Sequence, residues 1–178
     1  MIIEKRAEII KKKAELNKEE NELFLEMIEK DSFDLAFIDE SVKNIYGELK
    51  KIIKCEECGE CCREIIVVFE DEDLNKLAEA VKEDRKTLEK RLFQKYEKFN
   101  CFVMNQSPCP FQKENLCTVY DYRGTECRDF PYLENRLFSE IYRYVFQGYP
   151  MCPYHFSVIE SLKEALQFEN LKEGNFGS

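Results

Sequence analysis

Four of the nine cysteines in this 178-residue chain lie within eight residues, in the run Cys55-Glu-Glu-Cys58-Gly-Glu-Cys61-Cys62. Packing does not explain this crowding, because a buried cysteine behaves as a small hydrophobic residue. Cysteines spaced by two residues in a tight loop aim their sulfurs at one point, and Gly59 supplies the backbone freedom for such a loop. The spacing is typical of cubane iron–sulfur ligands and is also compatible with tetrahedral zinc. The run therefore predicts a metal site.

The adjacent pair Cys61–Cys62 adds a constraint on that site. Neighbouring side chains in an extended segment point to opposite sides, so the two sulfurs do not easily serve one mononuclear site. The pair predicts either two neighbouring metals or one polynuclear centre with sulfur bridges.

A second group of cysteines is spread along the following part of the chain. Proline follows two of them, and a proline after a ligand stiffens the loop and removes one backbone donor, as in ferredoxin-type runs. Both groups together supply eight thiolates, enough for two four-sulfur sites. The predicted metal ligands are Cys55, Cys58, Cys61, Cys62, Cys109, Cys117, Cys127 and Cys152.

Two further residues are expected to lie outside the metal site. Cys101 sits in the apolar stretch from Phe99 to Met104 and is expected to be a packed residue. His155 is the only histidine and follows Cys152 by three residues. Because eight cysteines already fill two sites, His155 is expected at a helix start or on the surface, not as a ligand.

Three arginines are neighbours of predicted ligands in the sequence. Arg63, Arg123 and Arg128 are expected to donate hydrogen bonds to sulfur and to offset the negative charge of a thiolate-rich centre. We therefore predict that they help to bind the cofactor.

Charge and hydropathy exclude several classes of function. The net charge is −9 and no segment is basic, which disfavours nucleic-acid binding. No apolar run exceeds the five residues from Ile65 to Phe69, so no membrane helix is expected. The start Met-Ile-Ile-Glu-Lys-Arg lacks the apolar region of a secretory signal, so a cytoplasmic location is expected. In that reducing compartment, clustered cysteines indicate metal binding more often than disulfides.

Apolar periodicity predicts a helical hairpin at the start of the chain. Residues 1–30 form a charged helix in this interpretation, and residues 33–54 form a second one with an apolar stripe that includes Ile38, Val42 and Leu49. The hairpin is expected to cover the core of the cysteine domain. The alternative is a hairpin that binds a protein partner or dimerises.

Residues 55–178 are expected to form the cysteine-cluster domain. A strand is predicted over 65–69, and the acidic run 70–73 is expected to start a helix as a capping and surface feature. A second helix is expected from Asp84 to Tyr96, short strands and loops over 100–135, and a closing helix over 155–169. The predicted fold class is α-rich α+β, with helices packed around a small loop-and-strand core that binds metal.

The cysteine motifs also resemble a known family. The quoted run, then Pro108-Cys109-Pro110-Phe111, then Cys117-Thr-Val-Tyr120-Asp-Tyr-Arg123-x-x-x-Cys127-Arg128-x-Phe130-Pro131, is similar to the YkgJ-type CxxCxxCC cysteine-cluster family. The family ordinarily has Arg-Pro where this chain has Arg123-Gly124. The resemblance implies that the region chelates zinc or iron. Flagellin lysine N-methylases are similar in their cysteine region, which implies one enzymatic alternative.

These observations lead to an ordered set of functional hypotheses. The first is a protein with one or two iron–sulfur clusters that carries electrons or senses redox state. The second is a zinc-stapled module that binds a protein partner through the N-terminal helices. The third is a metal-dependent enzyme that modifies proteins, although the sequence has no Gly-rich strand-to-helix loop of the dinucleotide type.

Overall fold

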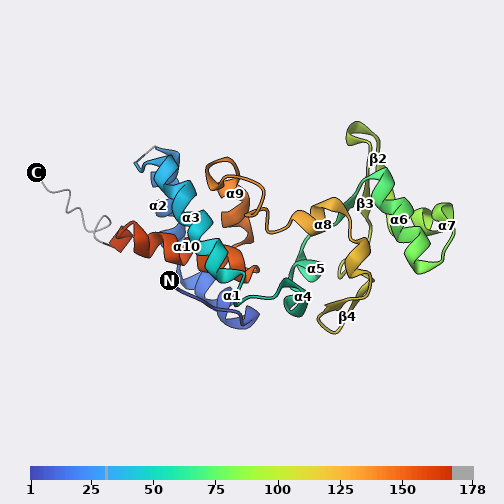
Figure 1. Cartoon of the computed structure of the whole chain (residues 1–178), viewed down its shortest axis with the longest axis horizontal. Coiled ribbons are helices and arrows are strands. Elements are labelled where there is room, and N and C mark those ends of the chain that lie inside the picture. The colour runs from blue at the N-terminus through green and yellow to red at the C-terminus, as the bar shows by residue number, and fades with distance from the viewer. Residues whose placement is uncertain (31, 170–178) are drawn as a thin grey trace, which may run out of the picture. The chain divides into compact units, whose positions relative to one another are not determined.

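The chain divides into two compact units, seen in a computed structural model that describes residues 1–30 and 32–169, without the side chains of residues 56 and 57. The helical unit comprises Met1–Lys54 together with the chain from Pro131 onward, and the cysteine unit comprises Cys55–Phe130 (Figure 1). In this division the C-terminal helices belong to the same unit as the N-terminal ones.

The helical unit consists of α1 (Ala7–Leu16), α2 (Lys18–Glu29), α3 (Leu35–Leu49), α9 (Phe138–Gly148) and α10 (Pro153–Ala165). α10 packs against α1, α3 and α9 and is buried along most of its length (Figure 1). α10 forms the core of this unit because apolar side chains on several of its faces, such as Phe156 and Ile159, are buried away from water. It is therefore the central helix of this unit.

The first predicted helix is interrupted at Asn17, between α1 and α2. Its amide nitrogen donates to the hydroxyl of Tyr149 at 3.2 Å, a long-range contact that no local periodicity reports. Residues 1–6 are not helical, and the backbone N–H of Ile2 donates to Ser161 Oγ at 2.8 Å. The second predicted helix, expected over 33–54, is α3 at Leu35–Leu49, and Asp34 caps it by accepting from the N–H of Ala36 at 2.9 Å.

The cysteine unit is built on a three-stranded antiparallel sheet of order β1-β3-β2, with β1 at Val68–Phe69, β2 at Phe93–Tyr96 and β3 at Cys101–Met104. Two helices, α6 (Asp71–Val81) and α7 (Arg85–Leu92), pack beside it. The apolar cluster between them contains Leu74, Leu77, Leu88, Leu92, Phe69, Phe93 and Phe102. The expected helix from Asp84 ends at Leu92, because the next four residues pair with β3.

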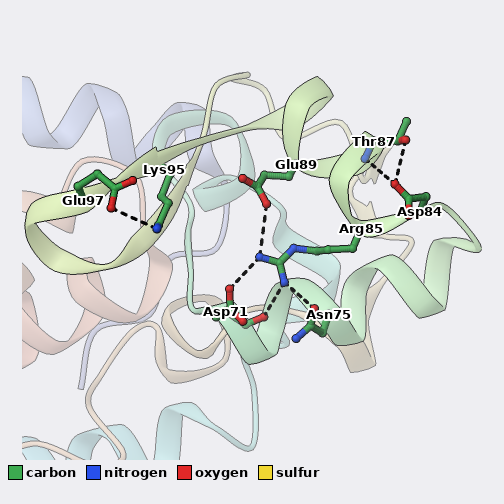
Figure 2. Close-up of polar contacts among 8 residues, drawn as sticks. All are labelled: Asp71, Asn75, Asp84, Arg85, Thr87, Glu89, Lys95 and Glu97. Atoms are coloured by element: carbon green, nitrogen blue, oxygen red, sulfur yellow. Dashed lines mark hydrogen bonds and ion pairs between the residues drawn. The ribbon is translucent and has the colours of Figure 1, made fainter.

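Arg85 fastens α7 to α6 and to the sheet. Its guanidinium donates to Asp71 Oδ1 at 2.9 Å and to Asn75 Oδ1 at 2.5 Å (Figure 2). It also lies 4.9 Å from the ring centroid of Phe102. Figure 2 also shows Asp84 capping α7 through the N–H of Thr87. The acidic start of α6 thus serves as an anchor for the next helix.

Short elements carry the cysteines. Cysteines lie in α4 (Cys55–Cys58), α5 (Cys61–Glu64), β5 (Leu116–Cys117) and α8 (Thr125–Asp129). The other short elements are β4 (Gln112–Lys113), which pairs with β5, and the 3-10 turns η1 (Glu97–Phe99) and η2 (Tyr120–Tyr122). The predicted α-rich α+β class is confirmed. Across the described ranges, no helix combines the length and the apolar character needed to cross a bilayer.

Candidate metal centre

The first cysteine run sits on the β4–β5 hairpin. Gly59 has a φ of 69°, and its carbonyl accepts from Gln112 Nε2 at 2.8 Å. A Cβ at this position would lie 2.3 Å from Gln112 Nε2 and 2.8 Å from the carbonyl oxygen of Asn115. Only glycine therefore allows the run to approach the hairpin this closely, and α4 contacts β5 as a result.

Cys62 connects the two cysteine groups. Its carbonyl accepts from the backbone N–H of Cys109 at 2.8 Å, and its sulfur accepts from the thiol of Cys61. Cys117 lies opposite Gln112 in the hairpin, and the N–H of Gln112 donates to the carbonyl of Cys109 at 3.0 Å. Backbone pairing thus brings three separate stretches of chain to the same place.

Backbone N–H groups already point at three of the sulfurs. The N–H of Glu60 donates to Cys58, that of Phe111 to Cys109 and that of Val119 to Cys117, and each lowers the pKa of its thiol. In all three cases the donor is two residues after the cysteine. Such bonds stabilise the thiolate relative to the thiol, and the thiolate is the form that binds metals.

The thiols differ widely in acidity. The hydrogen bond from Cys61, helped by the positive charges of Arg123 and Arg63, lowers the pKa of Cys62 to about 7 against the opposing effect of burial. Burial and the charge of Cys62 raise the pKa of Cys109 to about 11 and that of Cys127 to about 12. Burial also raises the pKa of Cys58 and of Cys117. Among these five thiols, Cys62 is therefore the one that ionises most readily.

Six of the predicted ligands belong to one neighbourhood in the cysteine unit: Cys58, Cys61, Cys62, Cys109, Cys117 and Cys127. Cys55 opens α4 in the same unit, whereas Cys152 precedes α10 in the helical unit and is buried. Cys101 lies in β3, opposite Tyr96. No cysteine in the described part of the chain forms a disulfide.

The donor set fits a thiophilic metal in its chemistry. Thiols are soft ligands that suit zinc, iron–sulfur clusters and copper(I), and the neighbourhood offers several of them beside an apolar core. As the side chains stand, no three His, Cys, Asp or Glu residues within 1–30 and 32–169 are arranged to hold a metal ion. Binding therefore requires the thiols to release protons and to converge further.

The three arginines have different surroundings. Arg63 binds Glu60 and Asn115, and Arg123 donates from Nε to the carbonyl of Tyr120 at 2.9 Å with its guanidinium 3.6 Å from the centre of that ring. Both lie close enough to Cys62 to lower its pKa. Arg128 instead pairs with Asp73 at 3.1 Å and with Thr125 Oγ1 at 2.8 Å. That all three help to bind the cofactor stays a prediction.

Asp73 is buried beside the candidate site, contrary to the prediction from the sequence. It was expected as part of an acidic surface run, but its side chain is only 4% exposed. Burial opposes its charge, yet hydrogen bonds from the N–H of Thr125 and from Arg128 hold the pKa below its usual range. These bonds fix the start of α8, which carries Cys127. No local sequence signal distinguishes Asp73 from its exposed neighbours.

His155 lies in the first turn of α10, as one of the two expectations had it, but it is buried and not on the surface. Its Nε2 donates to the carbonyl of Pro131 at 3.0 Å, and burial lowers its pKa to about 4. The neutral imidazole is thus a structural group of the helical unit.

The chain is a cysteine-rich protein whose thiols suit a soft metal ion. Comparison with protein families agrees: the CxxCxxCC family, described as a "putative zinc- or iron-chelating domain", matches residues 54–145. The match covers just over half of the chain, and the chain belongs to this family. No curated protein and no solved structure matches the chain.

Proposed function

We propose that the cysteine unit holds an iron–sulfur cluster and that the protein uses it to carry electrons or to sense redox state. The proposal is supported above all by the gathering of five other thiols around Cys62 from stretches of chain far apart in sequence. Cysteine thiolates are the usual ligands of such clusters. A bound cluster would supply a one-electron acceptor.

The residues around the thiols suit this role. Hydrogen bonds to sulfur and nearby positive charge tune the reduction potential of a cluster. Here backbone N–H groups donate to Cys58, Cys109 and Cys117, while Arg123 acts on Cys62. The apolar cluster behind the thiols limits access of water on that side. Because clustered cysteines that bind metal are typical of reducing compartments, we place this function in the cytoplasm.

Zinc is the second candidate, and one observation favours it. The elements that carry the clustered cysteines are very short, with two residues in β5 and four in each of α4 and α5. Such segments gain little from their own hydrogen bonds, so a metal that crosslinks them would provide much of their stability. In this case the protein would be a zinc-stapled module, with the N-terminal helices available to a protein partner.

Metal analysis separates the two candidates. The full chain is purified anaerobically, and iron, zinc and acid-labile sulfide are quantified per chain. Iron with sulfide, broad absorbance near ~400 nm and reversible bleaching by dithionite are expected for the cluster. Zinc without sulfide and without colour would establish the structural module instead, because zinc(II) is d10. A chain without iron or zinc would contradict both.

A further inference from the structure

We propose that Arg63 is a positioning residue of the metal centre, which holds the cysteine run of residues 55–62 to the turn of the β4–β5 hairpin. This inference rests on the proposed function, because it concerns the same centre. It differs from the expectation from the sequence, in which Arg63 donates hydrogen bonds to sulfur. Among the described residues, its guanidinium donates to oxygen acceptors only, on Glu60, Glu114 and Asn115.

The guanidinium of Arg63 binds two elements at once. Its Nη1 donates to the carboxylate of Glu60, the N-cap residue of α5. Its Nη2 donates to the side-chain oxygen of Asn115 and, at 3.2 Å, to the carbonyl of Glu114. Glu114 and Asn115 form the turn between β4 and β5. The planar fork of N–H groups makes such a contact possible, and the single ammonium group of a lysine does not reproduce it.

The turn that Arg63 contacts has an unfavourable backbone conformation. Glu114 has a φ of 56°, in the left-handed region that residues with a side chain rarely adopt. Such a conformation persists only where surrounding contacts hold it. The bond from Arg63 to the carbonyl of Glu114 is one of these contacts. Arg63 therefore also fixes the turn that leads into β5, the strand that carries Cys117.

A second contact holds the cysteine run to the same hairpin. Gln112 Nε2 donates to the carbonyl of Gly59 at 2.8 Å. Cys61 and Cys62 lie between this contact and Arg63, so the hairpin binds the chain on both sides of the two thiols. The contact at Arg63 therefore restricts where these two sulfurs can lie relative to β5.

The alternative role of Arg63 is that of a positive charge near thiolates, and substitutions separate the two roles. Arg63→Lys keeps the charge but loses the forked contact, whereas Arg63→Gln loses both. Asn115→Ala removes a partner and leaves the arginine in place. Because Asn115 is exposed in the turn, this change does not disturb the core. The matched control is Arg91→Lys in α7, where Arg91 pairs with Glu83.

Zinc(II) affinity is measured on the metal-free full chain by competition with a chromophoric chelator, and far-UV circular dichroism checks that each variant is folded. We expect Arg63→Lys and Arg63→Gln to weaken zinc binding equally, by about 10- to 100-fold, the range for groups that orient metal ligands. Asn115→Ala is expected to weaken binding as well. The double variant is expected to bind no more weakly than Arg63→Lys alone, because both changes break the same contact. Arg91→Lys is expected to bind zinc like the unaltered chain.

Two results would overturn the role proposed for Arg63 and leave the proposed function standing. The first is full affinity in Arg63→Lys together with weak binding in Arg63→Gln, which would show that charge alone matters. The second is unchanged affinity in every variant with a lower free energy of unfolding of the metal-free chain, which would make Arg63 a residue of the fold only. An unaltered chain that binds no zinc and contains no iron refutes the proposed function, and this inference with it.

Discussion

The carboxylate of Asp73, near the start of α6, accepts a hydrogen bond from the backbone N–H of Thr125 at 2.8 Å and so holds the first turn of α8. A buried side chain distant in sequence thereby positions Cys127. The same carboxylate pairs with Arg128 at 3.1 Å, so one group restrains both ends of this short helix.

Replacing Asp73 with alanine is expected to destabilise the protein. The change leaves the N–H of Thr125 without its acceptor and Arg128 without its ion pair, and hydrogen bonds to charged groups contribute about 1.5–3 kcal/mol each. We expect a loss of about 2–3 kcal/mol in the free energy of unfolding, measured with urea on the metal-free chain. The exposed Asp121 is the control, and Asp121→Ala is expected to change stability by less than about 0.5 kcal/mol. Equal effects of the two changes would contradict the anchoring role.

Gly59→Ala is expected to disrupt the metal centre. The positive φ of Gly59 costs a residue with a side chain about 1–2 kcal/mol, and the new Cβ would collide with Gln112 and with the backbone of Asn115. The cysteine run would then be displaced from the hairpin, with reduced metal content by elemental analysis. Gly47 in α3 is the matched control, because a Cβ there meets no atom within 4 Å. Gly47→Ala is expected to stabilise its helix by up to about 1 kcal/mol. Normal metal content in Gly59→Ala would refute the close fit.

Acid is expected to weaken the helical unit through His155. Its pKa is about 4 in the folded protein and 6.5 in an ordinary setting, so between these values the unfolded chain binds a proton that the folded chain does not. Well above pH 6.5 the imidazole is neutral in both states, so its pKa shift does not lower the free energy of unfolding. That free energy falls as the pH decreases from 6.5 toward 4. Between pH 7 and pH 5 the loss is about 2 kcal/mol.

Urea unfolding of the metal-free chain at the two pH values measures this loss. His155→Gln, which cannot be protonated, is expected to be less stable at pH 7 but to lack this part of the pH dependence. An identical pH dependence in the variant and the unaltered chain would show that the histidine does not cause it.

Metal affinity is expected to rise with pH. The pKa values of Cys109 and Cys127, about 11 and about 12, keep both thiols protonated at pH 7 until a metal displaces the protons. For each proton displaced, affinity rises about tenfold per pH unit. Zinc competition with a chelator of known pH dependence, between pH 6 and pH 8, measures the slope. A slope of zero would mean that no thiol proton is released.

The sequence by itself was sufficient for the class of protein. The crowded cysteines predicted metal binding and the family, and helical periodicity predicted an α-rich fold with a helix that starts at Asp84. These features are local: spacing of two residues in a loop, a period of 3.6 residues, and a carboxylate beside the first turn. These local features do not depend on the tertiary arrangement, provided that the apolar stripe is buried.

Only the tertiary structure decided which residues meet. It divided the first predicted helix at Asn17, turned the end of the second expected helix of the cysteine domain into β2, and buried Asp73 and His155. It also connected Cys62 with Cys109 through the backbone. Apart from the pairing of β2 with β3, which are neighbours in sequence, these outcomes depend on contacts between segments far apart in the chain, and the energy of such contacts is not encoded in any short window of sequence. Each candidate thiol can therefore be identified from the sequence, whereas only the fold determines which thiols lie close together.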